Sequence, residues 1–306
     1  MFITVATQVT ILLILILVGF VAAKTHLLND NGVKNMTDFV LMIVTPCVII
    51  KSFIREFNPA VLKNLLISFL ITILVHIFFI IASKLLLRSK DISRQKVLQF
   101  GIIFSNCGYM SIPLLQSILG DDGVFYGSSY IAVFNVFIWS YGLILMSGDK
   151  KSINPKKLIL NPGIIGITIS LIIFLCSIPI PKIIYEPISH IAYLNTPVPM
   201  IIIGYHLANS NLLKGLKDIK CLFAILLRLF ILPLVVLFAM YLCGIRGTIL
   251  LALTICSCAP TAAITTMFSS KYGADTELSV TLVSLSTILS LASMPIIVTL
   301  AQYLTK

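Results

Sequence analysis

The chain has 306 residues, of which 58% are hydrophobic and 11% are charged, and its mean hydropathy is +1.07. Soluble domains carry roughly a quarter charged residues, so this composition excludes a soluble globular protein and indicates one that spans a membrane. The formal net charge of +11 raises the question of a nucleic-acid partner, but the positions of the basic residues argue against one, as described below.

Apolar runs of about 20 residues, each long enough to cross the roughly 30 Å hydrocarbon core of a bilayer, recur ten times. In chain order they fall near residues 5–23, 37–54, 62–87, 97–119, 124–146, 158–178, 187–208, 219–242, 248–268 and 278–304. No connection between them is long enough to fold as a soluble domain. The first run has no basic residue before it, so we interpret it as a span rather than a cleaved signal peptide. The fold class predicted is an all-α polytopic membrane protein of ten helices.

The basic residues are distributed unevenly between the two sides of the membrane. The loops after spans 1, 3, 5, 7 and 9 hold 15 Lys and Arg residues, and the loops and end on the opposite side hold six, which leaves Arg228 inside span 8. Loops rich in Lys and Arg remain in the cytoplasm. The sequence therefore predicts a multi-pass protein of the plasma (inner) membrane with both termini extracytoplasmic, and no nucleic-acid partner.

Two of the apolar runs are interrupted by polar residues, small residues and proline. One reads Phe104-Ser-Asn-Cys-Gly-Tyr-Met-Ser-Ile-Pro113 and the other reads Cys256-Ser-Cys-Ala-Pro-Thr-Ala-Ala-Ile-Thr-Thr266. Hydrocarbon cannot solvate free peptide groups, so irregular backbone at membrane depth is tolerated only where it is buried in protein or lines a cavity. Interrupted spans at corresponding places in two halves of a chain indicate a transporter's binding site.

Three local patterns recur along the chain at nearly constant offsets. Thr45-Pro46 recurs as Thr196-Pro197, Pro113 recurs as Pro260, and Gly120-Asp-Asp122 recurs as Gly273-Ala-Asp275. We interpret residues 1–148 and 158–306 as two five-helix repeats joined by a basic cytoplasmic linker at 149–157. Because five is odd, the second repeat is inverted in the membrane, which allows spans 4 and 9 to cross at their breaks.

Proline suits the first turn of a helix, since the N–H that it lacks would be unpaired there. We therefore expect Pro113 and Pro260 to open half-helices whose positive amino ends face the crossing and favour an anion. The alternative is that prolines only kink membrane helices. We accept that alternative for Pro162 and Pro233, but not for the matched pair.

The ionisable residues restrict the mechanism. All eleven Asp and Glu residues fall in loops or at span ends, which argues against a coupling ion held by a carboxylate and against an aspartyl protease. The seven cysteines have no metal-ligand spacing and no accompanying His cluster. They are interpreted as small buried thiols. We expect no metal, no cofactor and no enzymatic activity.

Three ionisable groups remain at depth, and two roles are open for each. Arg228 either meets an anionic substrate or extends toward the cytoplasmic headgroups. His76 and His206 either carry protons or are neutral, hydrogen-bonded packing residues.

Uncharged polar side chains on the broken segments can bind a ligand without the cost of burying a charge. Asn106 either does so or ties off the backbone freed by its own break. Thr45 and Thr196 are expected to satisfy carbonyls released by their neighbouring prolines before they contact substrate. The full set of candidate substrate-binding residues is Asn106, Ser105, Cys107, Gly108, Tyr109, Pro113, Pro260, Thr261, Thr265, Thr45, Thr196 and Arg228.

These motifs carry a family resemblance. The segments that carry it are Asn106–Leu115, Gly120–Tyr126, Phe134–Gly142, Thr196–Gly204, Lys271–Asp275 and Ser286–Ser290. Together they resemble bacterial members of the auxin efflux carrier family, related to malate and malonate permeases, along nearly the whole chain. The second break departs from the family because Pro260 is followed by threonines and not by a more polar residue.

The resemblance implies a crossed-helix fold shared with bile-acid symporters and sodium–proton antiporters, with a scaffold and a transport domain. It also implies export or exchange of a small organic anion, such as an auxin-like compound, malate or malonate, by an elevator-type motion. The alternative is a sodium-coupled anion symporter of the same fold. An intramembrane enzyme and a membrane sensor are disfavoured, since no catalytic set and no output domain are present. The expected partners are the anion and the lipid bilayer, and a second copy of the chain is a candidate.

Overall fold

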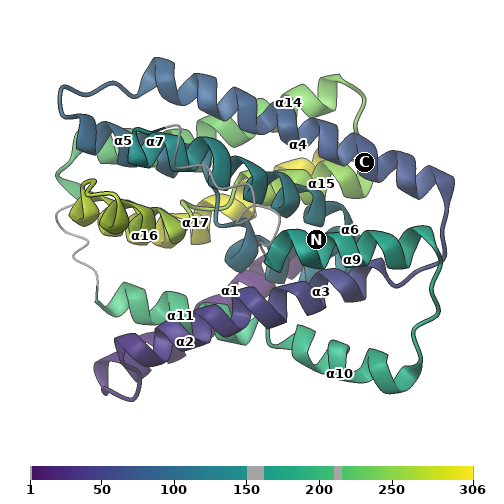
Figure 1. The fold of residues 1–306 in the computed structure, drawn as a ribbon. Helices are drawn as coiled ribbons and strands as arrows, with labels where there is room; N and C mark the ends of the chain where they lie inside the picture. The colour runs from purple at the N-terminus through teal and green to yellow at the C-terminus, as the bar shows by residue number, and fades with distance from the viewer. Residues whose placement is uncertain (1, 150–161, 210–215, 306) are drawn as a thin grey trace.

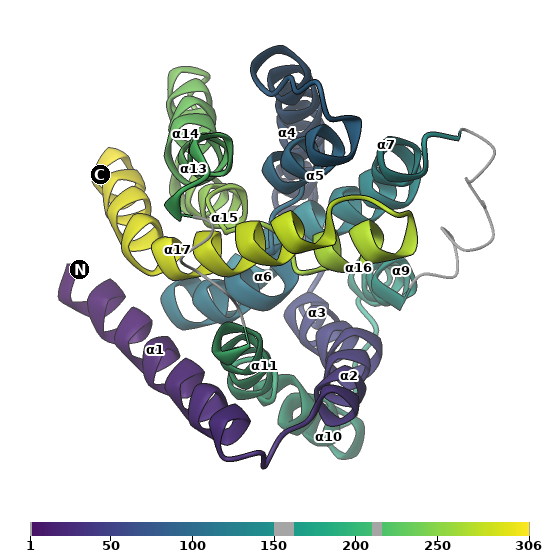
Figure 2. The same ribbon diagram turned by 90° about the vertical axis from the view of Figure 1, so that its left-hand side faces the viewer.

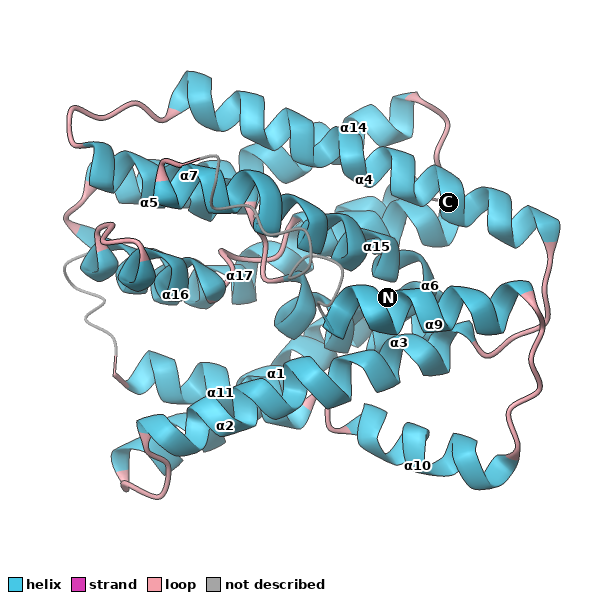
Figure 3. Cartoon of the chain, in the orientation of Figure 1, coloured by secondary structure: helices cyan, strands magenta, loops and turns pink. Residues whose placement is uncertain are grey.

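The computed structural model describes residues 2–149, 162–209 and 216–305, so residues 150–157 of the predicted linker lie outside it. Over the described residues the chain is all helical apart from one isolated antiparallel bridge, and most loops gather at two opposite ends of the molecule (Figure 3). The helices are α1 (Phe2–Lys24), α2 (Asp30–Phe39), α3 (Thr45–Phe53), α4 (Pro59–Leu86), α5 (Ile92–Ile103), α6 (Ile112–Phe137), α7 (Leu143–Ser147), α9 (Pro162–Leu175), α10 (Lys182–Tyr193), α11 (Pro197–Ala208), α13 (Ile219–Leu226), α14 (Leu232–Leu242), α15 (Gly247–Ser257), α16 (Ile264–Lys271) and α17 (Thr276–Leu304). Four wider π-helical turns join some of them: η1 (Val40–Val44), η2 (Cys107–Ser111), η3 (Ile138–Gly142) and η5 (Leu227–Ile231).

Within the described residues, six continuous helical segments are long and apolar enough to cross a membrane. They are Asp30–Phe53, Pro59–Leu86, Cys107–Ser147, Lys182–Ala208, Ile219–Leu242 and Thr276–Leu304. The chain is therefore a multi-pass membrane protein, as predicted. The other expected spans are shorter apolar helices or are interrupted, as at 97–119 and 248–268.

The longest of these segments contains most of two expected spans. Cys107–Ser147 is one helical run of 41 residues, but Gly120 inside it has φ 63° and ψ −152°. A glycine adopts this non-helical backbone without a steric penalty, because it has no Cβ. The kink lies at the boundary that the sequence predicted between residues 119 and 124.

The helices form two layers (Figures 1 and 2). The lower layer in Figure 1 holds α1, α2, α3, α9, α10 and α11, in which α1 packs on α11 and α3 packs on α9 and α10. The upper layer holds α4, α5, α7 and α13 to α17, and Figure 2 shows α16 and α17 running across its lower side, where α17 also contacts α1. Helix α6 lies between the layers and packs mainly on α4 and α15 of the upper one.

Short polar side chains in the loops determine where several helices begin. The Asn58 side chain accepts a hydrogen bond from Ala60 N at 2.8 Å at the start of α4. Asp91, Asp218 and Asp275 accept backbone N–H groups in the same way at the starts of α5, α13 and α17. Such caps satisfy N–H groups that a first helical turn leaves unpaired. None of the eleven acidic residues of the chain is buried.

Prolines account for three of the four π-helical turns. Pro46, Pro113 and Pro233 each stand two residues after such a turn, η1, η2 and η5 respectively. Proline lacks the N–H for the carbonyl four residues earlier, and its ring clashes with that carbonyl. A wider turn before the proline relieves the clash and lets the helix continue.

Helices α1 and α11 approach more closely than any side chain would permit. A Cβ added at Gly19 would lie 2.1 Å from the Ile201 carbonyl oxygen, and one added at Gly204 would lie 2.0 Å from the Ile16 carbonyl oxygen. Small residues at membrane helix interfaces allow such backbone contact. This contact fixes one side of the lower layer.

Ion pairs lie both between and within the layers. Arg55 pairs with Asp122 at 2.6 Å and Lys51 pairs with Asp121 at 3.6 Å, which joins the end of α3 to the Gly120 kink of α6. Both pairs are partly exposed, so each contributes little to stability.

The pairs within the upper layer involve Arg94. At the opposite end of the molecule Arg94 pairs with Asp218 and, at 3.5 Å, with Asp275. Partial burial alone would raise the pKa of Asp218, but the hydrogen bond and charge of Arg94 outweigh it and lower that pKa below its ordinary value.

Candidate binding site at the helix crossing

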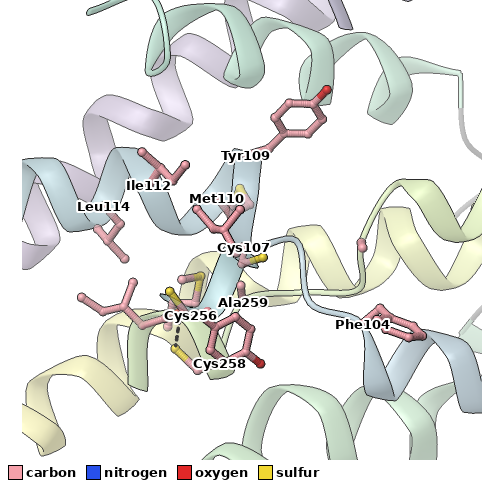
Figure 4. Packing of buried hydrophobic residues seen from close by; sticks show 14 of the residues in the cluster. Phe104, Cys107, Tyr109, Met110, Ile112, Leu114, Cys256, Cys258 and Ala259 are labelled. Carbon is pink, nitrogen blue, oxygen red and sulfur yellow. Dashed lines mark hydrogen bonds between the residues drawn. The ribbon is translucent and has the colours of Figure 1, made fainter. Parts of the chain in front are cut away.

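Two helices of the upper layer are interrupted, and their interruptions cross. The first interruption, 104–106, separates α5 from η2, and the second, 258–263, separates α15 from α16. Ser105 and Thr261 form an isolated antiparallel bridge between them. Figure 4 shows the two extended segments passing one another beside Cys107 and Ala259. The structure thus brings together the two segments that the sequence singled out.

The crossing segments satisfy each other's backbone. Asn106 N donates to the Pro260 carbonyl at 2.7 Å, and Ala262 N donates to the Phe104 carbonyl at 2.9 Å. Unpaired peptide groups are not tolerated at membrane depth. Two breaks that hydrogen-bond to one another are therefore more stable than either break alone.

Hydroxyl groups satisfy further backbone groups at the crossing. Thr261 Oγ1 donates to the Gly101 carbonyl at 3.1 Å, and Ser111 Oγ donates to the Ile255 carbonyl at 3.1 Å. Ser286 Oγ on α17 accepts from Thr261 N at 3.2 Å. Sequence reasoning did not select Ser111 or Ser286, although both lie in segments that carry the family resemblance, because nothing in the sequence indicates which helix faces the breaks.

Arg228 completes the backbone hydrogen bonding of the crossing. Its side chain is fully buried and donates to three carbonyls: Nε to Ala259 at 2.9 Å, one terminal nitrogen to Ile102 at 3.0 Å, and the other to Ser257 at 2.6 Å. The guanidinium also lies over the Phe79 ring at 5.2 Å. The alternative in which Arg228 extends toward the headgroups is therefore wrong. Direct contact of Arg228 with substrate stays a prediction.

The Asn106 side chain is one of the polar groups of the crossing that make no hydrogen bond within the described residues. It is 6% exposed and stands directly before η2, yet it makes no side-chain cap hydrogen bond. The amide therefore does not cap the helix after its own break, and its contact with substrate stays a prediction. Nearby, a Cβ added at Gly108 would find no heavy atom within 4 Å. Open space thus adjoins the first turn after the break, beside an unused amide.

The remaining candidates on the broken segments are buried. Ser105, Cys107 and Thr265 are at most 1% exposed, and the hydroxyls of Ser105 and Thr265 make no hydrogen bond within the described residues. Tyr109 points away from Cys256 and Cys258 in Figure 4. Its hydroxyl donates to the Thr37 carbonyl of α2 at 3.4 Å, so Tyr109 connects the crossing to the lower layer.

The two prolines of the crossing differ: Pro113 lies in the first turn of α6, as expected, although α6 continues η2 directly, whereas Pro260 lies outside a helix. Pro113 lies six residues beyond the start of η2, inside a continuous helical run. Pro260 lies in the extended segment itself, four residues before α16 begins. The reason is that a π-helical turn accommodates Pro113, while the Pro260 carbonyl is engaged by Asn106 N. Pro162 begins α9, and Pro233 follows η5, so these two prolines also do more than kink a helix.

Thr45 and Thr196 lie at the starts of α3 and α11 in the lower layer. Thr45 Oγ1 is 3.5 Å from Asn195 Oδ1, so the two segments meet. Thr45 is the first residue of α3 and not its cap, and Thr196, the cap of α11, makes no side-chain cap hydrogen bond. Their expected hydrogen bonds to carbonyls released by the prolines are absent from the described residues, and their contact with substrate stays a prediction.

The two histidines occupy different environments. His76 is fully buried, its Nδ1 is 2.9 Å from the Thr72 carbonyl, and its ring packs against Tyr130 and Phe137. The carbonyl partner requires Nδ1 to carry the hydrogen, and the buried Nε2 has no hydrogen-bond partner within the described residues. The geometry agrees with a neutral packing residue, because a charged ring would need an acceptor at Nε2 as well. His206 lies exposed near the end of α11.

Comparison with known proteins agrees with this architecture. The chain is 23% identical over 290 residues, 93% of its own length and 94% of its relative's, to a protein named as an uncharacterized transporter from Methanothermobacter thermautotrophicus. A family model described as membrane transport protein matches residues 4–298. The match covers nearly the whole chain, as the resemblance to auxin efflux carriers did. The chain therefore belongs to this family of membrane transport proteins and is a membrane transporter.

Proposed function

We propose that the chain is a secondary transporter that exports or exchanges a small organic anion bound at the helix crossing. One observation carries the proposal: the crossing combines the amino ends of η2 and α16 with Arg228, while no acidic residue of the chain is buried. Helix amino ends and a guanidinium favour negative charge. A carboxylate such as an auxin-like compound, malate or malonate would neutralise this site, and a cation would be repelled.

Asn106 and Gly108 would form the contact surface for the ligand. The amide of Asn106 has no structural partner within the described residues, and the space beside Gly108 allows a ligand to reach the first N–H groups of η2. A carboxylate oxygen can accept both the amide and a backbone N–H. Ser105, Cys107, Tyr109, Thr261 and Thr265 would support this surface, since each is buried or already bonded.

For the fold we propose ten spans in two inverted repeats. The packing of the lower layer supports a two-fold relation, because α1 packs on α11 in the same way that α9 packs on α3. Each contact includes a glycine: Gly19 lies against Ile201, and a Cβ at Gly166 would lie 3.2 Å from Pro46 Cβ. Gly19 and Gly166 occupy corresponding positions of the two proposed repeats.

For the mechanism we propose an elevator-type motion in which the upper layer moves against the lower layer as scaffold. The helices α5, α15 and α16 that lead into the breaks belong to the upper layer, so the site would move with it. The Arg55–Asp122 pair joins the layers, whereas the Arg94–Asp218 pair lies within the upper one. A reversible cross-link between Arg55→Cys and Asp122→Cys should stop transport until it is reduced, and one between Arg94→Cys and Asp218→Cys should not. Equal transport by both cross-linked proteins would contradict the motion.

The function itself is tested by flux in proteoliposomes of purified protein. We expect uptake of labelled monocarboxylates or dicarboxylates to exceed uptake of organic cations and neutral sugars of similar size. Preferential cation uptake would overturn the electrostatic argument. Replacing sodium by N-methylglucamine in the same assay separates this proposal from the sodium-coupled symporter.

Orientation in the plasma membrane is tested with two native thiols. Cys176 and Cys243 are exposed and lie after α9 and α14, on the side that the charge distribution assigns to the outside. In intact cells they should react with an impermeant maleimide. In a Cys176→Ser, Cys243→Ser background, Lys90→Cys should react only after permeabilisation. The opposite pattern would invert the proposed topology.

A homodimer stays a prediction that light scattering on the purified protein can test.

A further inference from the structure

The side chain of Arg228 binds the carboxyl ends of two interrupted helices at once. Ile102 lies one residue before the end of α5, Ser257 is the last residue of α15, and Ala259 lies two residues beyond it. The last carbonyls of a helix have no partner within it and carry the negative end of its dipole. The guanidinium therefore lies where two negative helix ends converge.

In carriers with discontinuous helices, such carbonyl groups commonly hold the coupling cation. The chemical requirement is a positive charge surrounded by several oxygen atoms, out of contact with water. Arg228 meets that requirement with a side chain. Its planar guanidinium has five N–H donors in a fixed arrangement and stays charged at any physiological pH.

The surroundings of Arg228 fit a structural cation. The side chain has no solvent exposure, and the Phe79 ring covers it at 5.2 Å. No buried carboxylate is available to neutralise it. The position of the side chain depends on η5, the π-helical turn that contains Arg228 and precedes Pro233.

We propose that Arg228 is a tethered cation that replaces a coupling ion at the crossing and so determines the ion independence of the transporter. A bound sodium ion dissociates in each cycle, whereas Arg228 cannot leave. The ends of α5 and α15 are held in both the loaded and the empty carrier. Transport then needs no sodium, and the carrier works as a uniporter or an anion exchanger. The part of this inference that concerns transport rests on the proposed function. The part that places the Arg228 guanidinium between the ends of α5 and α15 does not.

The first test measures the melting temperature of purified protein in detergent, without any substrate. The matched control is Arg246, which also donates to two carbonyls at a helix carboxyl end, those of Tyr241 and Ile245, but is exposed. Arg228→Ala should lower the melting temperature by about 5 °C or more. Guanidinium chloride at millimolar concentration should restore about half of that loss by binding the vacated position. Arg246→Ala should show neither effect.

A second pair of variants separates the charge of the side chain at position 228 from its size. The pair also keeps the proposal testable if Arg228→Ala does not fold. Arg228→Lys keeps a positive charge that reaches some of the carbonyls, and Arg228→Gln is neutral. We expect Arg228→Lys to melt above Arg228→Gln, and sodium to leave the wild type unchanged relative to N-methylglucamine. The proposal is overturned if the glutamine variant is as stable as the lysine variant, if guanidinium does not restore Arg228→Ala beyond Arg246→Ala, or if sodium stabilises the wild type.

The second test measures anion flux in proteoliposomes with sodium, potassium or N-methylglucamine as the only external cation. Wild-type flux should differ by less than about twofold among the three. A flux that requires sodium would overturn the inference. If no anion is transported but the melting results hold, the proposed substrate class fails, and the tethered cation remains supported.

Discussion

The two broken segments of the crossing resemble each other in sequence pattern but differ in chemistry. In the segment after α15, the side chain of Thr261 and the carbonyls of Ser257, Ala259 and Pro260 are all hydrogen-bonded within the protein. In the segment after α5, Asn106 has an unused amide and open space beside Gly108. The two breaks are therefore asymmetric: one segment holds the crossing together, and the other keeps the free amide that the proposed function assigns to the ligand.

The difference also bears on the departure that the resemblance implied for the second segment. That segment has threonine after Pro260, and its Thr261 hydroxyl donates to the Gly101 carbonyl. An asparagine would not be required for that contact. The site would then bind its ligand through one amide and not through two, which favours a small anion.

The largest effect is expected from filling the open space beside Gly108. Gly108→Leu should reduce transport to background, because the new side chain would occupy the proposed ligand position. Gly108→Ala should melt near the wild type, since no atom lies within 4 Å of the added Cβ. The converse variant is Gly101→Ala, whose Cβ would lie 2.4 Å from Leu282 Cδ2. Gly101→Ala should therefore lose stability. Normal transport by Gly108→Leu would show that the first segment does not face the ligand.

The next largest effect is expected from the prolines. Pro260→Ala adds an N–H inside the extended segment and should let α15 extend through the break, with loss of most transport. Pro113→Ala should lose less, since it only allows η2 to tighten toward an α-helical turn. Both should reach the membrane. The control is Pro295→Ala, because Pro295 lies inside α17 and in neither break. If Pro260→Ala transports as well as this control, the break is not needed for transport.

A tenfold effect is expected from Asn106→Ala. The variant removes one hydrogen bond to a charged ligand, so affinity should fall about tenfold, or about 1.4 kcal/mol. The melting temperature of the ligand-free protein should not change, because the amide has no partner there within the described residues. Measured affinity that is unchanged, together with lower stability, would assign Asn106 to the structural role instead.

The smallest effect on transport is expected from Thr261→Val. The variant leaves the Gly101 carbonyl without its donor, which should cost about 1–3 kcal/mol of stability and lower the melting temperature by several degrees. Ligand affinity should stay within about twofold of the wild type. A large loss of affinity would mean that the two segments share the ligand more equally than their hydrogen bonds indicate.

Much of this architecture could be predicted from the sequence. The apolar runs locate most helices to within a few residues, because hydrocarbon accepts only segments with internally paired backbone. The boundary near Gly120 and the breaks at 104–106 and 258–263 were indicated by glycine, proline and polar residues inside apolar runs. Membership of a transporter family agreed with these motifs.

Other features depended on the packing of distant residues. Pro46, Pro113 and Pro233 share π-helical turns that no local pattern distinguishes from Pro260 in its extended segment. Arg228 was assigned to the headgroups or to substrate, because a sequence cannot reveal that carbonyls 126 and 29 residues away converge on it.

By itself the sequence thus determined that the chain is a multi-pass membrane protein, where two of its helices break and that its apolar segments hold no carboxylate. These properties follow from side-chain hydropathy and backbone chemistry, which act locally. Only the tertiary structure decided which break is saturated with hydrogen bonds, which one keeps a free amide, and where Arg228 donates. Those outcomes depend on which polar groups meet across helices far apart in the chain, and a buried donor or acceptor is satisfied by whichever partner the packing brings within reach.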